Sequence, residues 1–235
     1  GQVCKADYDH GSVVQLTPKP DNGWRVKDWS GECLGSGDTC QISMDSDKQA
    51  GVSFEPIPHY KLSTIIDGQG LVSSDDGQIA CDPSCLGDYQ EGTQVQLQAQ
   101  PSEGWEFVGW EGDCSGTDTC QLAIGQDKKV VAHFKIRRLL VQIKADEGGQ
   151  VTSVDNLIDC GQTCSQDYDY GSSVELQAQA QDGYRFLGWE GDCSGVDVCK
   201  LDIKDVKSVH ARFEQIPVYH LDLSLIHISE PTRPE

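Results

Sequence analysis

The sequence predicts an all-β protein, arranged as a tandem array of small disulfide-stapled β domains. The first observation is repetition: GWEGDCSGTDTC at 109–120 returns as GWEGDCSGVDVC at 188–199, and a looser copy, DWSGECLGSGDTC, occupies 28–40. The second is that apolar residues alternate with a period of two and nowhere hold the 3.6-residue period of a helix. The third is that cysteines recur in register with the repeated phrase.

Aligned landmarks give the length of one repeat. Tyrosines 8, 89 and 168 recur in step with phenylalanines 54, 134 and 213, at a spacing of about 80 residues. That spacing exceeds typical solenoid periods, so each repeat is large enough to be a small domain. The predicted divisions are 1–58 as an N-terminally truncated repeat 1, 59–138 as repeat 2, 139–217 as repeat 3, and 218–222 as the start of a repeat 4.

Taken in order, the segments of repeat 2 predict about seven short strands. DGQG, at 67–70, lies between alternating stretches and predicts a β-hairpin, and 121–134 predicts a last hairpin. In GWEFVGW the period of two predicts that Trp105 and Phe107 share one face, with Val108 and Trp110 on the other. Repeat 1 opens mid-unit at GQVCKADYDHGS, which matches the sequence from Cys160, and continues with VVQLTPKPDNGWRVKDW, which predicts strand, turn and strand.

The 11 cysteines predict local disulfides and an oxidising compartment. Their CxxxC and CxxxxxC spacings lack the two-residue knuckle typical of zinc sites, and no histidine recurs with them. Sequence alone leaves three connectivities open for four cysteines. We expect Cys4 to be unpaired through truncation and the remaining cysteines to pair within their repeats: Cys33–Cys40, Cys81–Cys85, Cys114–Cys120, Cys160–Cys164 and Cys193–Cys199.

The composition and net charge exclude several classes of protein. A hydrophobic content of 37% is thin for one large core and favours several small ones. The net charge of -20 argues against nucleic acid and anionic membrane surfaces, which attract clustered cations. No stretch approaches 18 consecutive apolar residues, so we expect no membrane insertion in this fragment.

The last residues break the repeat pattern. VYHLDL, from Val218, matches the opening strand of a repeat, but LSLIHISEPTRPE follows at 223–235 without counterpart. This string resembles the translation of a sequencing-library adapter. We therefore exclude 223–235 from reasoning about fold and function.

The ordered series of CxxxC, tyrosine, GxxVxLxA, GWxFxGWxGxC and VxAxF resembles the divergent internalin-B B-repeat family of bacterial surface and secreted proteins. The resemblance implies a compact β unit, β-grasp-like or a small sandwich, strung in tandem on an extracellular protein. It implies no catalytic residues. In repeat 2 the series is carried by Cys81, Cys85, Tyr89, Gly92, Val95, Leu97, Ala99, Gly104, Trp105, Phe107, Gly109, Trp110, Gly112, Cys114, Cys120, Val130, Ala132 and Phe134.

Two kinds of side chain are candidate ligand sites. Trp29, Trp110 and Trp189 could form a sugar platform if exposed, although packing in the core and on the disulfide is the expected alternative. The acidic loops are weak calcium candidates because they lack a DxDxDG pattern. The four candidate ligands are Asp113, Asp118, Asp192 and Asp197.

Histidine offers no catalytic signal. His133 and His210 fall in the last strand of their repeats. We expect them to occupy equivalent positions there and to lie at the surface. Serine-hydrolase, zinc-protease, P-loop and dinucleotide motifs are absent. We therefore expect a non-catalytic, cofactor-free bacterial repeat region at the cell surface or secreted, acting as a spacer or adhesion array towards an unknown protein or glycan. The alternative is a carbohydrate- or matrix-binding module of a secreted enzyme.

Overall fold

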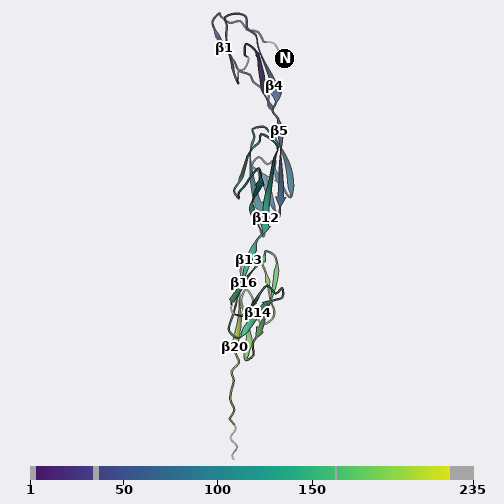
Figure 1. Ribbon diagram of the computed structural model, residues 1–235, viewed down its shortest axis with the longest axis vertical. Coiled ribbons are helices and arrows are strands. Elements are labelled where there is room, and N and C mark those ends of the chain that lie inside the picture. Colours follow the sequence, from purple (N-terminus) through teal and green to yellow (C-terminus); the bar gives the residue numbers. More distant parts are fainter. Residues whose placement is uncertain (1–3, 34–36, 162, 223–235) are drawn as a thin grey trace, which may run out of the picture. The chain divides into compact units, whose positions relative to one another are not determined.

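The structure, a computed structural model, describes residues 4–33, 37–161 and 163–222 (Figure 1). These residues form twenty strands and no helix, which confirms the predicted all-β array. No helix that could cross a membrane occurs among them. The predicted tail at 223–235 lies outside the described residues.

The chain divides into two compact parts, Gly1–Lys135 and Ile136–Glu235. Repeat 2 lies in the first part, except for its last residues from Ile136 onward. It has eight strands, where the sequence predicts about seven. They are β5 (His59–Asp67), β6 (Gly70–Ser74), β7 (Ala80–Cys81), β8 (Ser84–Gln90), β9 (Gln94–Pro101), β10 (Trp105–Gly112), β11 (Cys120–Ala123) and β12 (Lys128–Ile136).

Repeat 2 is a small sandwich of two four-stranded sheets, with strand orders β10-β12-β5-β8 and β11-β9-β6-β7. Every connection except β6 to β7 carries the chain from one sheet to the other. The two predicted hairpins, at 67–70 and 121–134, are therefore wrong. Alternation locates strands, but it does not say which sheet each strand joins, and here the turns are corners between sheets.

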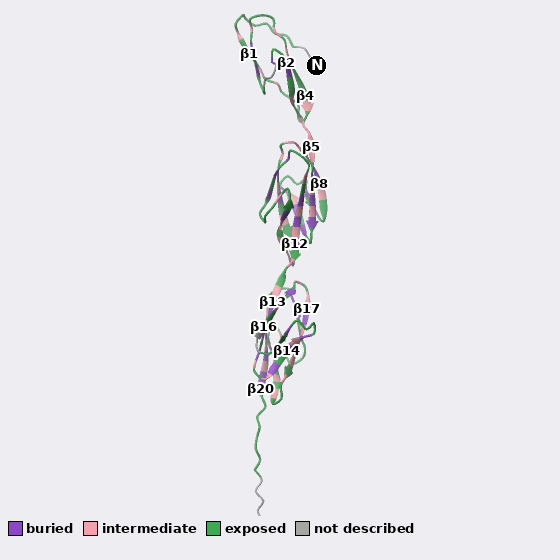
Figure 2. Ribbon diagram, in the orientation of Figure 1, coloured by how far each residue is buried: buried purple, intermediate pink, exposed green. Residues whose placement is uncertain are grey.

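The core lies between the two sheets and follows the alternation in the sequence (Figure 2). In β12, Val130, Ala132 and Phe134 are buried while the residues between them are not. Leu62 from β5 and Leu97 from β9 are fully buried in the same cluster. Both sheets therefore contribute one apolar face to a common core, which is what gives a sandwich its stability.

The first and last strands of repeat 2 lie side by side and run parallel. β5 pairs with β12 from Leu62 opposite Lys128 to Asp67 opposite His133. Because the strands point the same way, the chain enters the repeat at one end of the sandwich and leaves it at the other.

Repeat 3 is built in the same way in the second compact part. Its sheets have the orders β16-β13-β20-β18 and β15-β14-β17-β19, and β13 runs parallel to β20. Its strands are β13 (Arg138–Ala145), β14 (Gly149–Ser153), β15 (Asp159–Cys160), β16 (Thr163–Asp169), β17 (Ser173–Ala180), β18 (Tyr184–Gly191), β19 (Cys199–Asp202) and β20 (Lys207–Gln215).

The described part of repeat 1 has four strands, in the two-stranded sheets β1-β3 and β2-β4. They correspond to β9–β12 of repeat 2. Side chains that are buried in repeat 2 are accordingly more open: Tyr8 is 52% exposed against 2% for Tyr89, and Phe54 37% against 5% for Phe134. The strands are β1 (Val13–Leu16), β2 (Trp24–Gly31), β3 (Cys40–Ser43) and β4 (Ala50–Pro56).

One polar atom in the core of repeat 2 yields a prediction. Among the described residues, the Oγ1 of Thr64 is the one buried side-chain oxygen or nitrogen without a hydrogen-bond partner. The equivalent position in repeat 3 is Ile143, which is also buried. Replacing Thr64→Val removes the unpaired hydroxyl while keeping the shape, so we expect repeat 2 to become more stable by about 1 kcal/mol.

Hydrogen exchange by mass spectrometry on the whole chain measures this, because peptides from repeat 3 serve as an internal reference. The matched variant Ile143→Thr places the same unpaired hydroxyl in repeat 3. Its effect should be the opposite one: amide exchange in repeat 3 should become faster. Unchanged or faster exchange of the β5 and β12 amides in Thr64→Val would contradict the prediction.

Candidate functional site

The repeated tryptophan points into the core because its strand contains a β-bulge. The register of β18 against β20 shifts between Phe186 and Gly188, and β2 shifts at the equivalent place against β4. Phe186 and Trp189 consequently face the same side and meet edge-to-face at 5.1 Å between ring centroids. An extra residue in a strand reverses the side on which the following residues lie.

Repeat 2 has the same arrangement, which corrects the predicted facing of its aromatic residues. Phe107 and Trp110 lie 5.0 Å apart, and Phe107 also contacts Phe134 at 5.3 Å. Trp110 is therefore on the side of Phe107, whereas Val108 is 45% exposed. A strict period of two cannot predict this, because two residues separate Phe107 from Trp110 and yet both rings face the same side.

A glycine stands at this place in repeats 2 and 3, whereas repeat 1 has Asp28 there. Gly188 has a φ of 139°, in a region that side chains with a Cβ rarely adopt, and an added Cβ would lie 2.8 Å from the carbonyl oxygen of Gly195. That carbonyl accepts a hydrogen bond from the backbone N–H of Trp189 at 2.8 Å. The close approach of loop and strand thus depends on the missing side chain.

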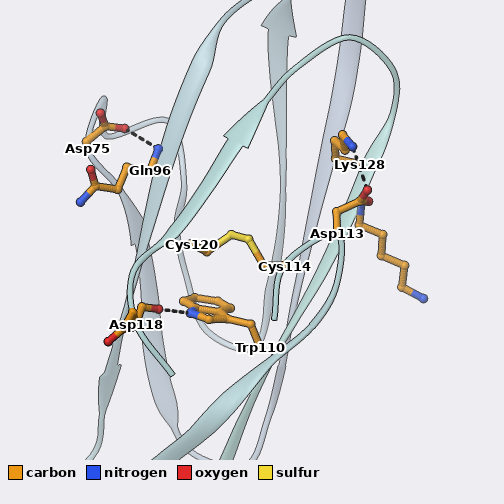
Figure 3. The surroundings of a disulfide bond; sticks show 9 residues. Asp75, Gln96, Trp110, Asp113, Cys114, Asp118, Cys120 and Lys128 are labelled. Atoms are coloured by element: carbon orange, nitrogen blue, oxygen red, sulfur yellow. Dashed lines mark hydrogen bonds and ion pairs between the residues drawn. A yellow bond between two sulfur atoms is a disulfide. The ribbon is translucent and has the colours of Figure 1, made fainter. Parts of the chain in front are cut away.

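The indole closes the loop from the other side (Figure 3). The Nε1–H of Trp110 donates to the carbonyl oxygen of Asp118 at 2.7 Å, and Trp189 donates to that of Asp197 at 2.7 Å. In repeat 1, Trp29 donates to Gly37 at 2.8 Å, also eight residues ahead. A buried indole N–H needs an acceptor, and the loop backbone supplies it in all three repeats.

Disulfides bridge the same loops. The structure joins Cys33 with Cys40, Cys114 with Cys120, and Cys193 with Cys199. It also joins the CxxxC pairs, Cys81 with Cys85 and Cys160 with Cys164, while Cys4 is free and exposed.

The three tryptophans are not a surface platform. Trp29, Trp110 and Trp189 are only 8%, 6% and 4% exposed. The hypothesis of a sugar platform on these residues is therefore wrong, and the alternative of core packing against the disulfide is what the structure shows. The ring needs burial for its apolar body and a loop carbonyl for its N–H, so neither part is left for a ligand.

The calcium candidates have structural partners. Asp113 accepts hydrogen bonds from the Nζ of Lys128 at 2.9 Å and the backbone N–H of Lys129 at 2.7 Å, and the Lys128 contact in particular lowers the pKa of its carboxyl (Figure 3). Asp192 likewise accepts from the N–H of Ser208 at 2.6 Å. These carboxylates tie the loop to the last strand.

Asp118 and Asp197 contribute their backbone carbonyls to the tryptophan bonds. Within 4–33, 37–161 and 163–222, no group of three or more His, Cys, Asp or Glu side chains is arranged to hold a metal ion. The weak hypothesis of a calcium site at these four residues gains no support from this geometry.

A second network was missed from the sequence. Ser74 is buried; its Oγ–H donates to Asp76, and its oxygen accepts the backbone N–H of Ile79 at 2.9 Å. The phenol of Tyr89 also donates to Asp76, at 3.4 Å. Burial works against the charged carboxylate, but these hydrogen bonds lower its pKa.

Repeat 3 has the same network on Ser153, Asp155, Ile158 and Tyr168. The signal that could have found it is the spacing SxDxxIxC, present at residues 74–81 and 153–160. The network fixes the β6–β7 and β14–β15 turns next to the CxxxC disulfides.

A basic side chain bridges two carboxylates on the outer face of the sheet that contains the first and last strands of each full repeat. In repeat 2, His133 on β12 contacts Asp67 at 2.9 Å through Nδ1 and Glu111 at 2.8 Å through Nε2. The hydrogen bonds to Asp67 and then to Glu111 raise the pKa of His133 above its ordinary value of 6.5. Three neighbouring strands are thereby linked by one imidazole.

Repeat 3 uses arginine at this position. Arg212 contacts Asp146 at 2.8 Å and Glu190 at 2.7 Å. Phe134 corresponds to Phe213, so the residue equivalent to His133 is Arg212 and not His210. The expected alignment of the two histidines is therefore wrong by two residues. His210 joins the same cluster by contacting Asp146 at 2.8 Å, and both histidine side chains are partly exposed, at 33% for His133 and 23% for His210.

Comparison with known proteins identifies the repeat. A family model for the divergent InlB B-repeat domain matches residues 1–58, 71–138 and 139–217. A search of the curated proteins gives no match.

Two solved structures are similar at low identity. The Bacillus anthracis TIE protein has 7% identity and a TM-score of 0.44, with 86% of this chain and 51% of that chain covered, so this chain spans about half its length. GBS52, the minor pilin of the Gram-positive pathogen Streptococcus agalactiae, has 8% identity and a TM-score of 0.25, with 70% of this chain and 100% of that chain covered. At these TM-scores neither similarity supports an argument about function.

The loop disulfide should stabilise its own repeat. Replacing Cys114→Ser together with Cys120→Ser removes the bridge across a separation of 6 residues, which on loop entropy should cost repeat 2 about 2 kcal/mol. Hydrogen exchange on the whole chain should show faster exchange in residues 59–138 alone. The double variant of Cys193 and Cys199 should move the effect to repeat 3, and an effect spread over both repeats would contradict local stapling.

The His133 bridge predicts a pH dependence. Because the folded pKa is raised, the contribution of the bridge is complete below the unfolded pKa near 6.5 and is lost as pH rises through the folded value. Stability of repeat 2 should therefore fall between mildly acidic and mildly alkaline pH. An NMR titration of the His133 ring reports the pKa, and His133→Arg, copying Arg212, should remove the bridge's pH dependence; a His133 pKa at or below 6.5 would refute it.

Proposed function

Because the chain belongs to the divergent InlB B-repeat domain family, we propose that it is the non-catalytic extracellular repeat region of a bacterial surface or secreted protein, and that its repeats act as a spacer. The observation that carries this proposal is the parallel pairing of the first and last strands in both full repeats.

Parallel terminal strands make each repeat a length-adding element. The chain enters at His59 and leaves at Ile136, and the register of the parallel pair places these two ends about 36 Å apart along the strands. A fold whose ends met at one side would add little distance between the domains before and after it.

The same pairing resists tension. When the two ends of repeat 2 are pulled apart, β5 and β12 slide past each other, and the hydrogen bonds along their paired segment are loaded together. Neither disulfide joins β5 to β12, since one links β7 to β8 and the other bridges the loop to β11. The parallel pair therefore takes the force directly.

The proposed location is supported by the disulfides. Five bridges occur among the described residues, and such bonds persist in oxidising compartments outside the cytoplasm. A net charge of -20 favours solubility and keeps neighbouring molecules apart. If the repeats also bind a partner, we propose that it is an extracellular protein or a glycan.

Single-molecule force spectroscopy tests the spacer proposal. Pulled through its two ends, repeat 2 should unfold in one cooperative event at high force. Handles at His59 and Gln126, which both lie near the starting ends of β5 and β12, should open the pair one bond at a time and lower the force several-fold. Equal forces in the two geometries would contradict a role for the parallel pair.

Reduction provides an internal check in the same experiment. Opening both disulfides of repeat 2 releases residues held behind separations of 4 and 6, which should lengthen the unfolded chain by about 24 Å after subtracting the bridged spans. Reduction should lower the unfolding force of repeat 2 by less than moving the handles to His59 and Gln126 does.

A further inference from the structure

The outer face of the β11-β9-β6-β7 sheet in repeat 2 carries no charged side chain. Its outward positions alternate with the buried ones. Five of them are glutamines: Gln94, Gln96, Gln98 and Gln100 on β9, and Gln121 on β11. The other outward positions on these strands are Leu71, Ser73, Ala80 and Ala123.

This neutrality is a property of repeat 2 and not of the fold. At equivalent outward positions repeat 3 has Asp159, Glu175, Lys200 and Asp202. Lys200 and Glu175 form an ion pair at 2.7 Å. In a chain with 24% charged residues and a net charge of -20, a whole sheet face without charge is distinctive.

The amides are arranged in rows across the strands. Gln96 lies directly opposite Gln121, and Gln98 opposite Ser73. Along β9 successive outward amides repeat at about 6.8 Å, since two residues separate them. The nearest acid in the adjoining turn, Asp75, accepts the backbone N–H of Gln96 at 3.1 Å (Figure 3). The amides themselves offer both donors and acceptors to solvent.

A hollow adjoins these rows at Gln98. It has a volume of about 210 Å³ and is lined by Gln98, Ala99, Phe107, Thr117, Asp118 and Thr119. Phe107 is held in place by its contacts with Trp110 and Phe134. None of the four polar side chains that line the hollow makes a hydrogen bond to another described residue, so their polar groups are available to a ligand.

We propose that this face of repeat 2 binds a neutral glycan, with one sugar ring in the hollow against Phe107 and neighbouring sugars along the glutamine rows. An aromatic ring offers an apolar surface to the C–H face of a sugar, and amides and hydroxyls match its hydroxyl groups. An anionic glycan finds no cation on this face and meets Asp118 in the hollow. The proposal goes beyond the spacer function and does not depend on it.

Repeat 3 shows why the face should be selective. Val196 and Val198 stand where repeat 2 has Thr117 and Thr119, and both are exposed, at 64% and 45%. The counterpart of the hollow therefore loses two hydroxyls, and the sheet beside it is charged. Repeat 3 is a natural control with the same scaffold.

The test uses the whole chain, labelled with ¹⁵N, and neutral hexasaccharides of glucose, mannose, galactose and N-acetylglucosamine. At least one should shift backbone signals of β9, β11 and the loop around Thr117 in a saturable way, with repeat 3 unaffected. Sulfated dextran should not shift them. No shift with any neutral sugar, or equal shifts in both repeats, would overturn the proposal.

Two variants copy repeat 3 and so are expected to keep the fold. Gln96→Glu with Gln121→Lys introduces the ion pair of Glu175 and Lys200, and Thr117→Val with Thr119→Val removes the hydroxyls. Each should weaken sugar binding by about tenfold or more, with hydrogen exchange of the core unchanged. Undiminished binding in both would refute the assigned site. Concentration-dependent shifts on this face without sugar would show instead that it pairs two copies of the chain.

Discussion

The buried indole N–H determines how each repeat is assembled. Trp110 can be inside only if its nitrogen finds an acceptor, and the acceptor is a loop carbonyl eight residues ahead. The loop must therefore fold back over the strand, which Gly109 permits and the Cys114–Cys120 bridge maintains. Asp113 then ties the loop to β12. In repeats 2 and 3, glycine, disulfide and aspartate together hold the loop over the buried ring.

The strand connections explain how two four-stranded sheets suffice for a domain. The chain crosses between the sheets at nearly every connection, so each buried side chain is held by neighbours that are distant in sequence. Local disulfides across separations of 4 and 6 residues stabilise the loops and leave the parallel terminal strands free to define the ends of the repeat. Stapling and length are thus provided by different parts of the structure.

The sequence was sufficient where one physical rule acts alone. Alternation located the strands, and the recurring cysteines indicated local bridges, because both depend on neighbouring residues. Alternation failed at Trp110, which faces the same side as Phe107, and at the turns near Gly68 and Gln126, where sheet membership depends on distant partners. The buried Ser74 network was overlooked because a serine and an aspartate in a turn usually indicate only local hydrogen bonding.

The two full repeats show which positions the fold constrains and which it leaves open. The large aromatic residues of the core are kept, since Phe134 corresponds to Phe213 and Trp110 to Trp189, although the buried Thr64 corresponds to Ile143. The basic residue that bridges two carboxylates is His133 in repeat 2 and Arg212 in repeat 3. The bridge therefore depends on protonation at this position in repeat 2 and not in repeat 3. Outer sheet faces change most, from glutamine rows to an ion pair. A scaffold fixed by its core can vary its surface without loss of stability, and differences between repeats are therefore where separate binding properties should be sought.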